Sequence, residues 1–197
     1  MLYTIQDQFL TLTVDDLGAQ MMALTGSDGT EYLWSGDPAF WRNRAPNLFP
    51  YVGRSTDDSC TIKGIRYPMT RHGFANRSVF TVGSRGEDRI TFTLTDSPET
   101  RENYPWAFLF SVSYALTERT VEITYEVINR DREPIWFGLG GHPGFRVPLE
   151  AGRDFTDYAL TFGRPCSPGR VELSEAYMIS GRETAFPLTN GDTLPLR

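Results

Sequence analysis

The sequence has little of several features that would each point to a class of protein. Its 197 residues include only two cysteines, Cys60 and Cys166, too few for a disulfide framework and consistent with a reducing compartment. Acidic residues outnumber basic ones, and the net charge of -6 argues against a general nucleic-acid-binding surface. No apolar run approaches a membrane span, and the first residues lack the regions of a signal peptide. We therefore predict a cytoplasmic protein with neither nucleic-acid nor membrane partners.

Several catalytic and binding motifs are missing as well. There is no Gly-x-Gly-x-x-Gly before a helix and no phosphate loop, which disfavours nucleotide binding. The tripeptide Gly53-Arg54-Ser55 does not match the nucleophile elbow of a serine hydrolase. The chain has two histidines, His72 and His142, and no pairing of these with the cysteines has the spacing of zinc ligands. We expect no bound metal ion.

What the sequence does contain is a series of short segments in which apolar and polar residues alternate, the pattern of β-strands. These segments are residues 9–14, 89–95, 108–116 and 121–127, followed by weaker ones at 158–162 and 171–173. Asp28-Gly29, Lys63-Gly64 and Asn190-Gly191 are typical of hairpin turns. Ser97 followed by Pro98 predicts one short helix over residues 97–104.

This pattern predicts an all-β protein, an antiparallel sandwich or barrel with at most one or two short helices. With 40% hydrophobic residues, the chain is long enough for one well-filled core. We see no internal repeat, low-complexity tract or linker, so residues 1–197 are assigned to a single domain.

The most unusual stretch is residues 137–145, in which four glycines and a proline surround His142. Glycine in a strand marks a bulge or a close approach of two backbones, so this stretch is not an ordinary strand. An imidazole on such a frame is accessible to a small ligand and titrates near neutrality. The alternative is a half-buried histidine that is hydrogen-bonded in a turn.

The second histidine, His72, is also followed by a glycine and an aromatic residue, and it directly follows Arg71. Loops at one end of a β-sandwich can converge on a cleft, so a site shared by His72 and His142 is plausible. Arg54 follows a segment rich in proline and aromatic residues, and its guanidinium could bind hydroxyl or phosphate oxygens. The alternative for Arg54 is an ordinary surface arginine.

Three motifs together resemble the aldose 1-epimerase (galactose mutarotase) family, and its LacX-like branch most closely. They are Asn-Leu-Phe-Pro-Tyr-Val-Gly-Arg at 47–54, Arg-His-Gly-Phe-Ala at 71–75, and Gly-Leu-Gly-Gly-His-Pro-Gly-Phe at 138–145. The segment at 28–34 fits as well. The resemblance implies a large antiparallel β-sandwich of the galactose mutarotase type, with a cleft for a sugar.

The resemblance also implies a reaction, the interconversion of the α and β anomers of a hexopyranose without a cofactor. His142 would be the general acid that gives a proton to the ring oxygen, an exchange that suits an imidazole near neutral pH. His72 would hold or polarise the same oxygen. Arg54, His72 and Arg71 would bind the substrate.

One part of the family pattern is not found. The family's general base is a glutamate near the C-terminus, and the chain is shorter than is usual in the family. We therefore expect a domain that is incomplete at its C-terminus. Without this base, we expect the chain to have little activity. We do not transfer the base to Glu172, Glu175 or Glu183, which would be the first candidates if a base is present.

Two alternatives remain open, a hexose-6-phosphate mutarotase with Arg54, Arg71 and Arg77 as phosphate ligands, and a non-catalytic carbohydrate-binding sandwich. Exposed strand edges predict a homodimer or an aggregation-prone monomer.

Overall fold

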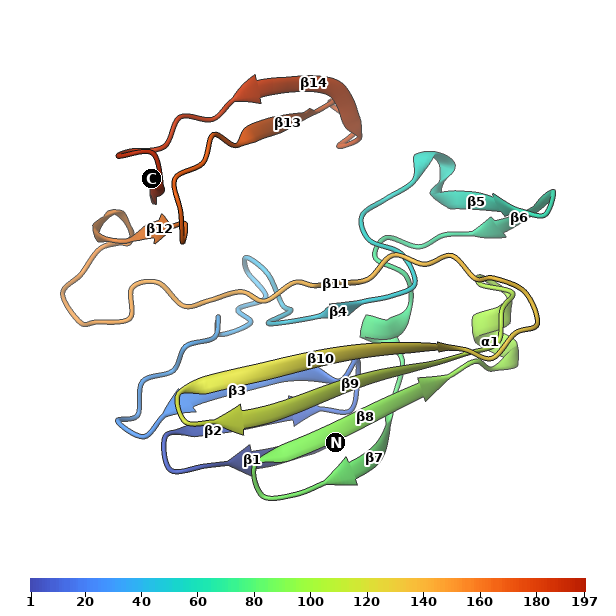
Figure 1. The fold of residues 1–197 in the computed structure, drawn as a ribbon, viewed down its shortest axis with the longest axis horizontal. Coiled ribbons are helices and arrows are strands. Elements are labelled where there is room, and N and C mark those ends of the chain that lie inside the picture. Colours follow the sequence, from blue (N-terminus) through green and yellow to red (C-terminus); the bar gives the residue numbers. More distant parts are fainter. The chain divides into compact units, whose positions relative to one another are not determined.

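The computed structural model describes residues 1–197 and contains two compact units, Met1–Arg146 and Val147–Arg197 (Figure 1). Strands dominate both units, and the one α-helix is α1 (Pro98–Arg101). Three short 3-10 helices occur at Thr56–Asp58, Ala75–Arg77 and Phe155–Asp157. The predicted antiparallel all-β fold is confirmed, whereas the assignment of residues 1–197 to a single domain stays a prediction.

The first sheet of the N-terminal unit has three antiparallel strands in the order β1-β2-β3. They are β1 (Leu2–Gln6), β2 (Leu10–Asp15) and β3 (Gln20–Gly26). The predicted alternation of β2 is confirmed, because its apolar side chains Leu10, Leu12 and Val14 are all buried. This strand therefore presents one face to the core and the other towards solvent.

The second sheet has four antiparallel strands in the order β10-β9-β8-β7. Their bounds are β7 (Thr81–Arg85), β8 (Arg89–Thr95), β9 (Phe108–Thr117) and β10 (Thr120–Asn129). The hairpin predicted between the two long strands is confirmed, and Glu118 in its turn has a positive φ of 55°. The predicted helix is shorter than expected, but Ser97 caps it in a capping box.

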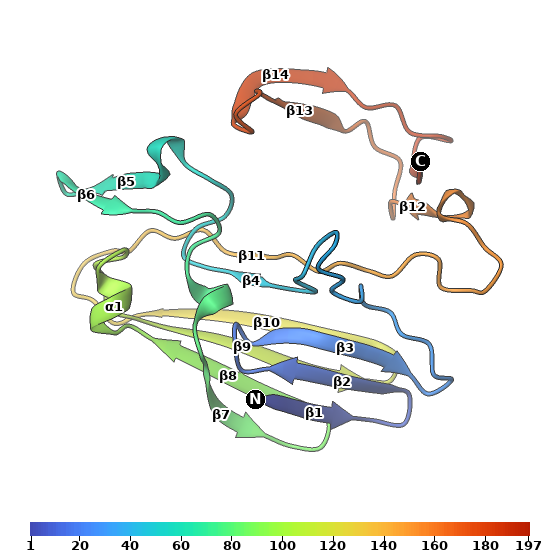
Figure 2. The same cartoon turned by 180° about the vertical axis from the view of Figure 1, so that it is seen from behind.

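One core cluster joins side chains from both sheets, and Figures 1 and 2 show the two sheets stacked face to face. Tyr3 of β1 packs edge-on against Phe92 of β8, with ring centroids 5.6 Å apart. On β9 the buried hydrophobic side chains are Phe108, Phe110, Val112, Tyr114 and Leu116. Burial of this apolar surface is the main stabilising contribution to the sandwich.

Two shorter strand pairs complete the N-terminal unit. The strand β4 (Asn47–Leu48) pairs antiparallel with β11 (Gly140–Gly141). The hairpin of β5 (Ser59–Ile62) and β6 (Ile65–Pro68) turns at Lys63 and Gly64, both with positive φ, as the sequence predicts. The first of these pairs carries the segment that precedes His142.

The C-terminal unit contains two strand pairs. β12 (Ala159–Thr161) pairs with β15 (Thr193–Pro195), and β13 (Gly169–Leu173) pairs with β14 (Ile179–Ala185). The predicted turn at Asn190-Gly191 is confirmed by reciprocal backbone hydrogen bonds between Thr189 and Thr193. No helix in the structure combines the length and the apolar character that a bilayer span requires.

A buried amide connects β4 to both sheets. The Asn47 side chain is 2% exposed, and its Nδ2 donates to the carbonyl oxygens of Gly18 (3.0 Å) and Ala19 (2.8 Å) in the turn between β2 and β3. Its Oδ1 accepts from the Tyr125 hydroxyl of β10 at 2.8 Å, and Tyr114 of β9 donates to the Ala19 carbonyl at 2.6 Å. Every polar atom of this amide is therefore satisfied, as burial demands.

We predict that Asn47→Ala lowers the free energy of unfolding by about 3 kcal/mol, because the Gly18 carbonyl and the Tyr125 hydroxyl lose their partner. Urea unfolding measures the change. Gln8→Ala removes an exposed amide and should change the same quantity by less than about 0.5 kcal/mol. Equal effects of the two substitutions would contradict a structural role for the buried amide.

Candidate active site

His72 is held by a reciprocal pair of hydrogen bonds with Gly53. The backbone N–H of His72 donates to the Gly53 carbonyl at 2.9 Å, and the Gly53 N–H donates to His72 Nδ1 at 3.1 Å. Because Nδ1 accepts a hydrogen bond, the imidazole is assigned the neutral tautomer with its hydrogen on Nε2. His72 can therefore present an N–H donor without carrying a charge.

The loop that carries His72 lies directly on the backbone that follows β4. His72 and Gly73 both have positive φ, 64° and 72°, and a Cβ at Gly73 would lie only 2.3 Å from the Phe49 carbonyl oxygen. The N–H groups of Phe74 and Ala75 both donate to that oxygen at 3.0 Å. A side chain at position 73 would push the loop away and break these bonds.

Arg77 secures the other side of this loop. Its Nη2 donates to the Thr70 hydroxyl and to the Gly73 carbonyl, both at 2.7 Å. The guanidinium therefore acts on the conformation of the loop, a role that the sequence analysis did not identify.

His142 follows β11 and is fixed through its backbone. Its N–H donates to the Pro46 carbonyl at 3.1 Å, and the N–H of Gly144 donates to the Arg44 carbonyl at 2.7 Å. A Cβ at Gly141 would lie 2.9 Å from the Tyr125 hydroxyl. The glycines around His142 thus mark close approaches, as the sequence predicts, and the imidazole itself is exposed.

The two imidazoles lie together, although 70 positions separate them in the sequence. Their ring centroids are 6.0 Å apart at an interplanar angle of 69°. The Trp41 ring lies on His142, with centroids 5.2 Å apart at 47°. The expected meeting of His72 and His142 is confirmed as geometry, while their roles as substrate-binding and catalytic groups stay predictions.

The surroundings of His72 favour its neutral form. Burial is the largest cause that lowers the pKa of His72 below its ordinary value, followed by the charge of His142 and then by that of Arg71. The lowered pKa agrees with the tautomer that the Gly53 hydrogen bond assigns. A neutral His72 is suited to donating a hydrogen bond to an oxygen of a ligand.

The arginines expected to bind the substrate have fewer contacts with the two histidines. Arg54 Nε donates to Asp58 at 3.0 Å in an exposed ion pair, and Arg54 makes no hydrogen bond or ring contact with either imidazole. The Arg71 side chain is exposed beside His72. Substrate binding by Arg54 and Arg71 therefore stays a prediction.

Trp41 could not be singled out from the sequence as the ring beside His142. The signal present in the sequence was the density of aromatic residues between positions 34 and 51. Nothing in their spacing indicates which ring reaches His142, because that contact depends on the pairing of distant segments.

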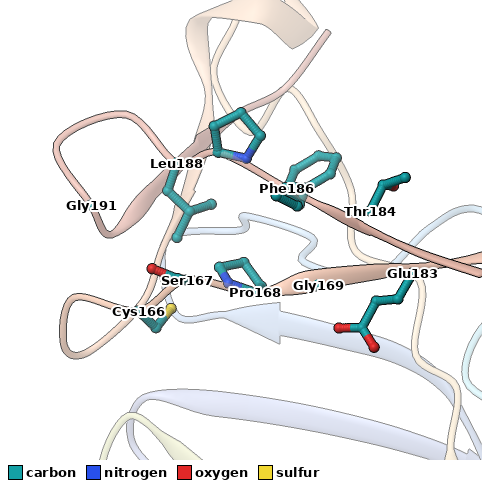
Figure 3. Close-up of a pocket in the computed structure, with 11 residues that line it drawn as sticks. Cys166, Ser167, Pro168, Gly169, Glu183, Thr184, Phe186, Leu188 and Gly191 are labelled. Atoms are coloured by element: carbon teal, nitrogen blue, oxygen red, sulfur yellow. The ribbon is translucent and has the colours of Figure 1, made fainter.

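A separate hollow of about 590 Å³ lies within the C-terminal unit (Figure 3). Cys166, Leu188 and the carboxylate of Glu183 are among its lining residues. Glu172 and Glu175 belong to the same unit, Glu172 on β13 and Glu175 between β13 and β14. No three His, Cys, Asp or Glu side chains of the structure form a group that could hold a metal ion.

Comparison with known proteins gives concordant matches. Residues 1–162 match the family model described as aldose 1-epimerase. The plasmid-encoded protein LacX of Lactococcus lactis subsp. lactis is 32% identical over 164 residues, which cover 80% of this chain and 55% of LacX. The chain thus spans about half the length of the curated relatives it matches.

Two solved structures share the fold at a similar level of identity. A galactose mutarotase related enzyme from Lactobacillus acidophilus is 33% identical with a TM-score of 0.94, and the match covers 100% of this chain and 65% of that one. A galactose mutarotase-like protein from Lactobacillus casei is 34% identical with a TM-score of 0.91, and the match covers 100% and 67% of the two chains. These matches confirm the expected galactose mutarotase-like fold.

We predict that the pKa of His72, measured from its imidazole proton shifts by NMR, lies below the ordinary value of about 6.5. The unfolded chain then binds the His72 proton more tightly than the folded chain does. The free energy of unfolding should therefore decrease as the pH falls through the ordinary histidine range. His142→Asn should raise the pKa of His72 only in part, because burial is the larger cause. An unperturbed His72 in the folded protein would refute the assigned environment.

We predict that Gly73→Ala lowers the free energy of unfolding by at least about 3 kcal/mol, because the new Cβ meets backbone atoms of Phe49 and Pro50. Gly29→Ala is the matched control, since Gly29 also has a positive φ but no atom within 4 Å of the added Cβ. The control should cost about 1–2 kcal/mol from backbone strain alone. Thermal or urea unfolding compares them, and equal losses would exclude a special close approach at Gly73.

Proposed function

Because the chain belongs to the aldose 1-epimerase family, we propose that it binds a hexopyranose and interconverts its α and β anomers. The observation that carries the proposal is the pairing of an exposed imidazole, His142, with a neutral one, His72, at a centroid distance of 6.0 Å. The main chain of both residues is fixed by hydrogen bonds, and the His72 ring is bonded as well, so a substrate would meet an arrangement that is largely formed.

In this proposal His142 is the general acid. It donates a proton to the ring oxygen as the bond from that oxygen to the anomeric carbon breaks, while the anomeric hydroxyl loses its proton to water and becomes the aldehyde oxygen. Rotation about the bond between C1 and C2 and the reverse proton transfers close the ring on the other face. Protons, bonds and charge balance over the cycle, and no cofactor enters it.

His72 supports this step as a hydrogen-bond donor. Its Nδ1 is occupied by the Gly53 N–H, so only Nε2–H faces a ligand. A neutral donor holds the sugar oxygen without adding a second positive charge beside a protonated His142.

Arg54 and Arg71 would bind the hydroxyl groups. The ion pair of Arg54 with Asp58 is exposed on both sides, with side-chain exposures of 40% and 57%. Exposed ion pairs contribute at most about 1 kcal/mol, so Arg54 can exchange its carboxylate partner for a sugar at low cost.

The arrangement favours an unphosphorylated sugar over a hexose 6-phosphate. Arg77, one of three arginines considered as phosphate ligands, already donates to Thr70 and Gly73 within the loop. A non-catalytic sugar-binding role is the second alternative, because the reaction also needs a group that accepts the anomeric proton. A cytoplasmic location and a homodimer stay predictions.

We propose that water accepts the anomeric proton in this chain, since no residue here is assigned as the general base. The 197-residue chain should then be at least about 100-fold less active than a longer relative, the effect of losing one general base. Polarimetry on freshly dissolved α-glucose and α-galactose measures the rate, with spontaneous mutarotation subtracted and glucose 6-phosphate as the comparison substrate.

His142→Asn should abolish the remaining activity. If the wild-type chain instead turns over as fast as a longer relative and His142→Asn abolishes it, a base is present, and Glu172, Glu175 and Glu183 become the first candidates. Activity that survives in His142→Asn would contradict the assigned acid.

A further inference from the structure

We propose that Trp41 binds the apolar C–H face of the sugar ring beside His142, and so selects a closed pyranose over an open-chain polyol. This inference rests on the proposed function, because it names a substrate contact of the same site. It adds an apolar contact to a site that otherwise consists of imidazole and guanidinium groups.

The position of the Trp41 ring is the first observation. It packs against the exposed His142 imidazole at a centroid distance of 5.2 Å, and the side chain is only half-buried. Apart from His72, it is the one aromatic ring in contact with His142. A ligand that reaches His142 would therefore lie close to the indole.

The second observation is that the backbone carrying the Trp41 indole is fixed by hydrogen bonds on both sides of the peptide. The Trp34 indole Nε1 donates to the Trp41 carbonyl at 2.7 Å, and the Trp41 N–H donates to the Asp37 carbonyl at 2.8 Å. The Trp34 N–H donates in turn to the Gly144 carbonyl at 2.9 Å, which ties this turn to the segment of His142. Such support reduces the entropy lost when a ligand binds.

Gly144 supplies the third observation. A Cβ at this position would lie 2.8 Å from Trp41 Cζ3 and 3.1 Å from the Trp34 Cβ. The absence of a side chain at position 144 therefore lets the indole lie against the backbone two residues after His142. Gly144, one of the four glycines around His142, is therefore needed for the position of the Trp41 ring.

The chemistry of the substrate complements this surface. A pyranose ring presents hydroxyl groups around its edge and C–H groups on its faces. The imidazoles and guanidiniums can bind the edge, whereas an aromatic face can cover the C–H groups and remove apolar surface from water. An open-chain polyol carries similar hydroxyls but has no fixed apolar face.

The neighbouring residue Phe40 provides a matched control. It is aromatic, lies in the same turn and is 82% exposed, and it packs on Trp34 at 6.3 Å without contacting His142. Removing Phe40 tests the loss of an exposed aromatic ring from this turn. Removing the Trp41 ring tests the proposed contact between the indole and the sugar beside His142.

The experiment follows binding by NMR, so that it does not depend on turnover. The 197-residue chain is titrated with galactose and with galactitol, and the His142 imidazole signals give the dissociation constant for each variant. The indole N–H signal of Trp41 is assigned by its loss in Trp41→Phe. We expect galactose to shift this indole signal and galactitol to leave it unchanged.

Trp41→Ala should weaken galactose binding about fivefold to tenfold, Trp41→Phe by less, and Phe40→Ala by less than about twofold. If Trp41→Ala does not fold, the wild-type indole shift and Trp41→Phe still decide the question. A chain that binds galactose with an unshifted Trp41 signal and the same affinity in Trp41→Phe overturns this inference alone. A wild-type chain whose His142 signals do not respond to galactose overturns the proposed function and this inference together.

Discussion

The backbone from Pro46 to Gly53 is the constraint on which the candidate site depends, and the buried Asn47 amide fixes it. Pro46 accepts the N–H of His142, Phe49 accepts two N–H groups of the loop after His72, and Gly53 pairs with His72 itself. Both imidazoles are thus attached to one segment. Because Asn47 binds the turn between β2 and β3 and the Tyr125 hydroxyl of β10, that segment is attached to both sheets.

Close packing explains why glycine recurs around both histidines. At Gly73 an added Cβ would meet backbone atoms of Phe49 and Pro50, whereas at Gly141 and Gly144 it would lie within 3.0 Å of the side chains of Tyr125 and Trp41, which would have to shift. The closeness has a structural consequence, because the main chains of both histidines are fixed by backbone hydrogen bonds, and so is the ring of His72. The glycines therefore provide rigidity here and not flexibility.

The strands with regular alternation could be predicted from the sequence because that signal is local. The predicted strand at residues 89–95 coincides with β8, and the long hairpin of β9 and β10 was found with its turn. The two-residue strands β4 and β11 could not be found, since proline and glycine interrupt any periodicity there. The contact of Trp41 with His142 and that of Arg77 with the Gly73 carbonyl could not be predicted either, because both are made only in the folded chain.

The environment of His72 gives the two histidines different capacities, although sequence alone makes them look alike. Two protonated imidazoles at a centroid distance of 6.0 Å would repel each other, and this repulsion favours a state in which one of them is neutral. Protonation of His72 would set an N–H of the ring against the N–H of Gly53 and break a hydrogen bond. No comparable backbone donor occupies the ring of His142. The hydrogen bond from Gly53 therefore distinguishes the two rings, and it agrees with the proposed division of roles, in which His142 is the acid and His72 the neutral donor.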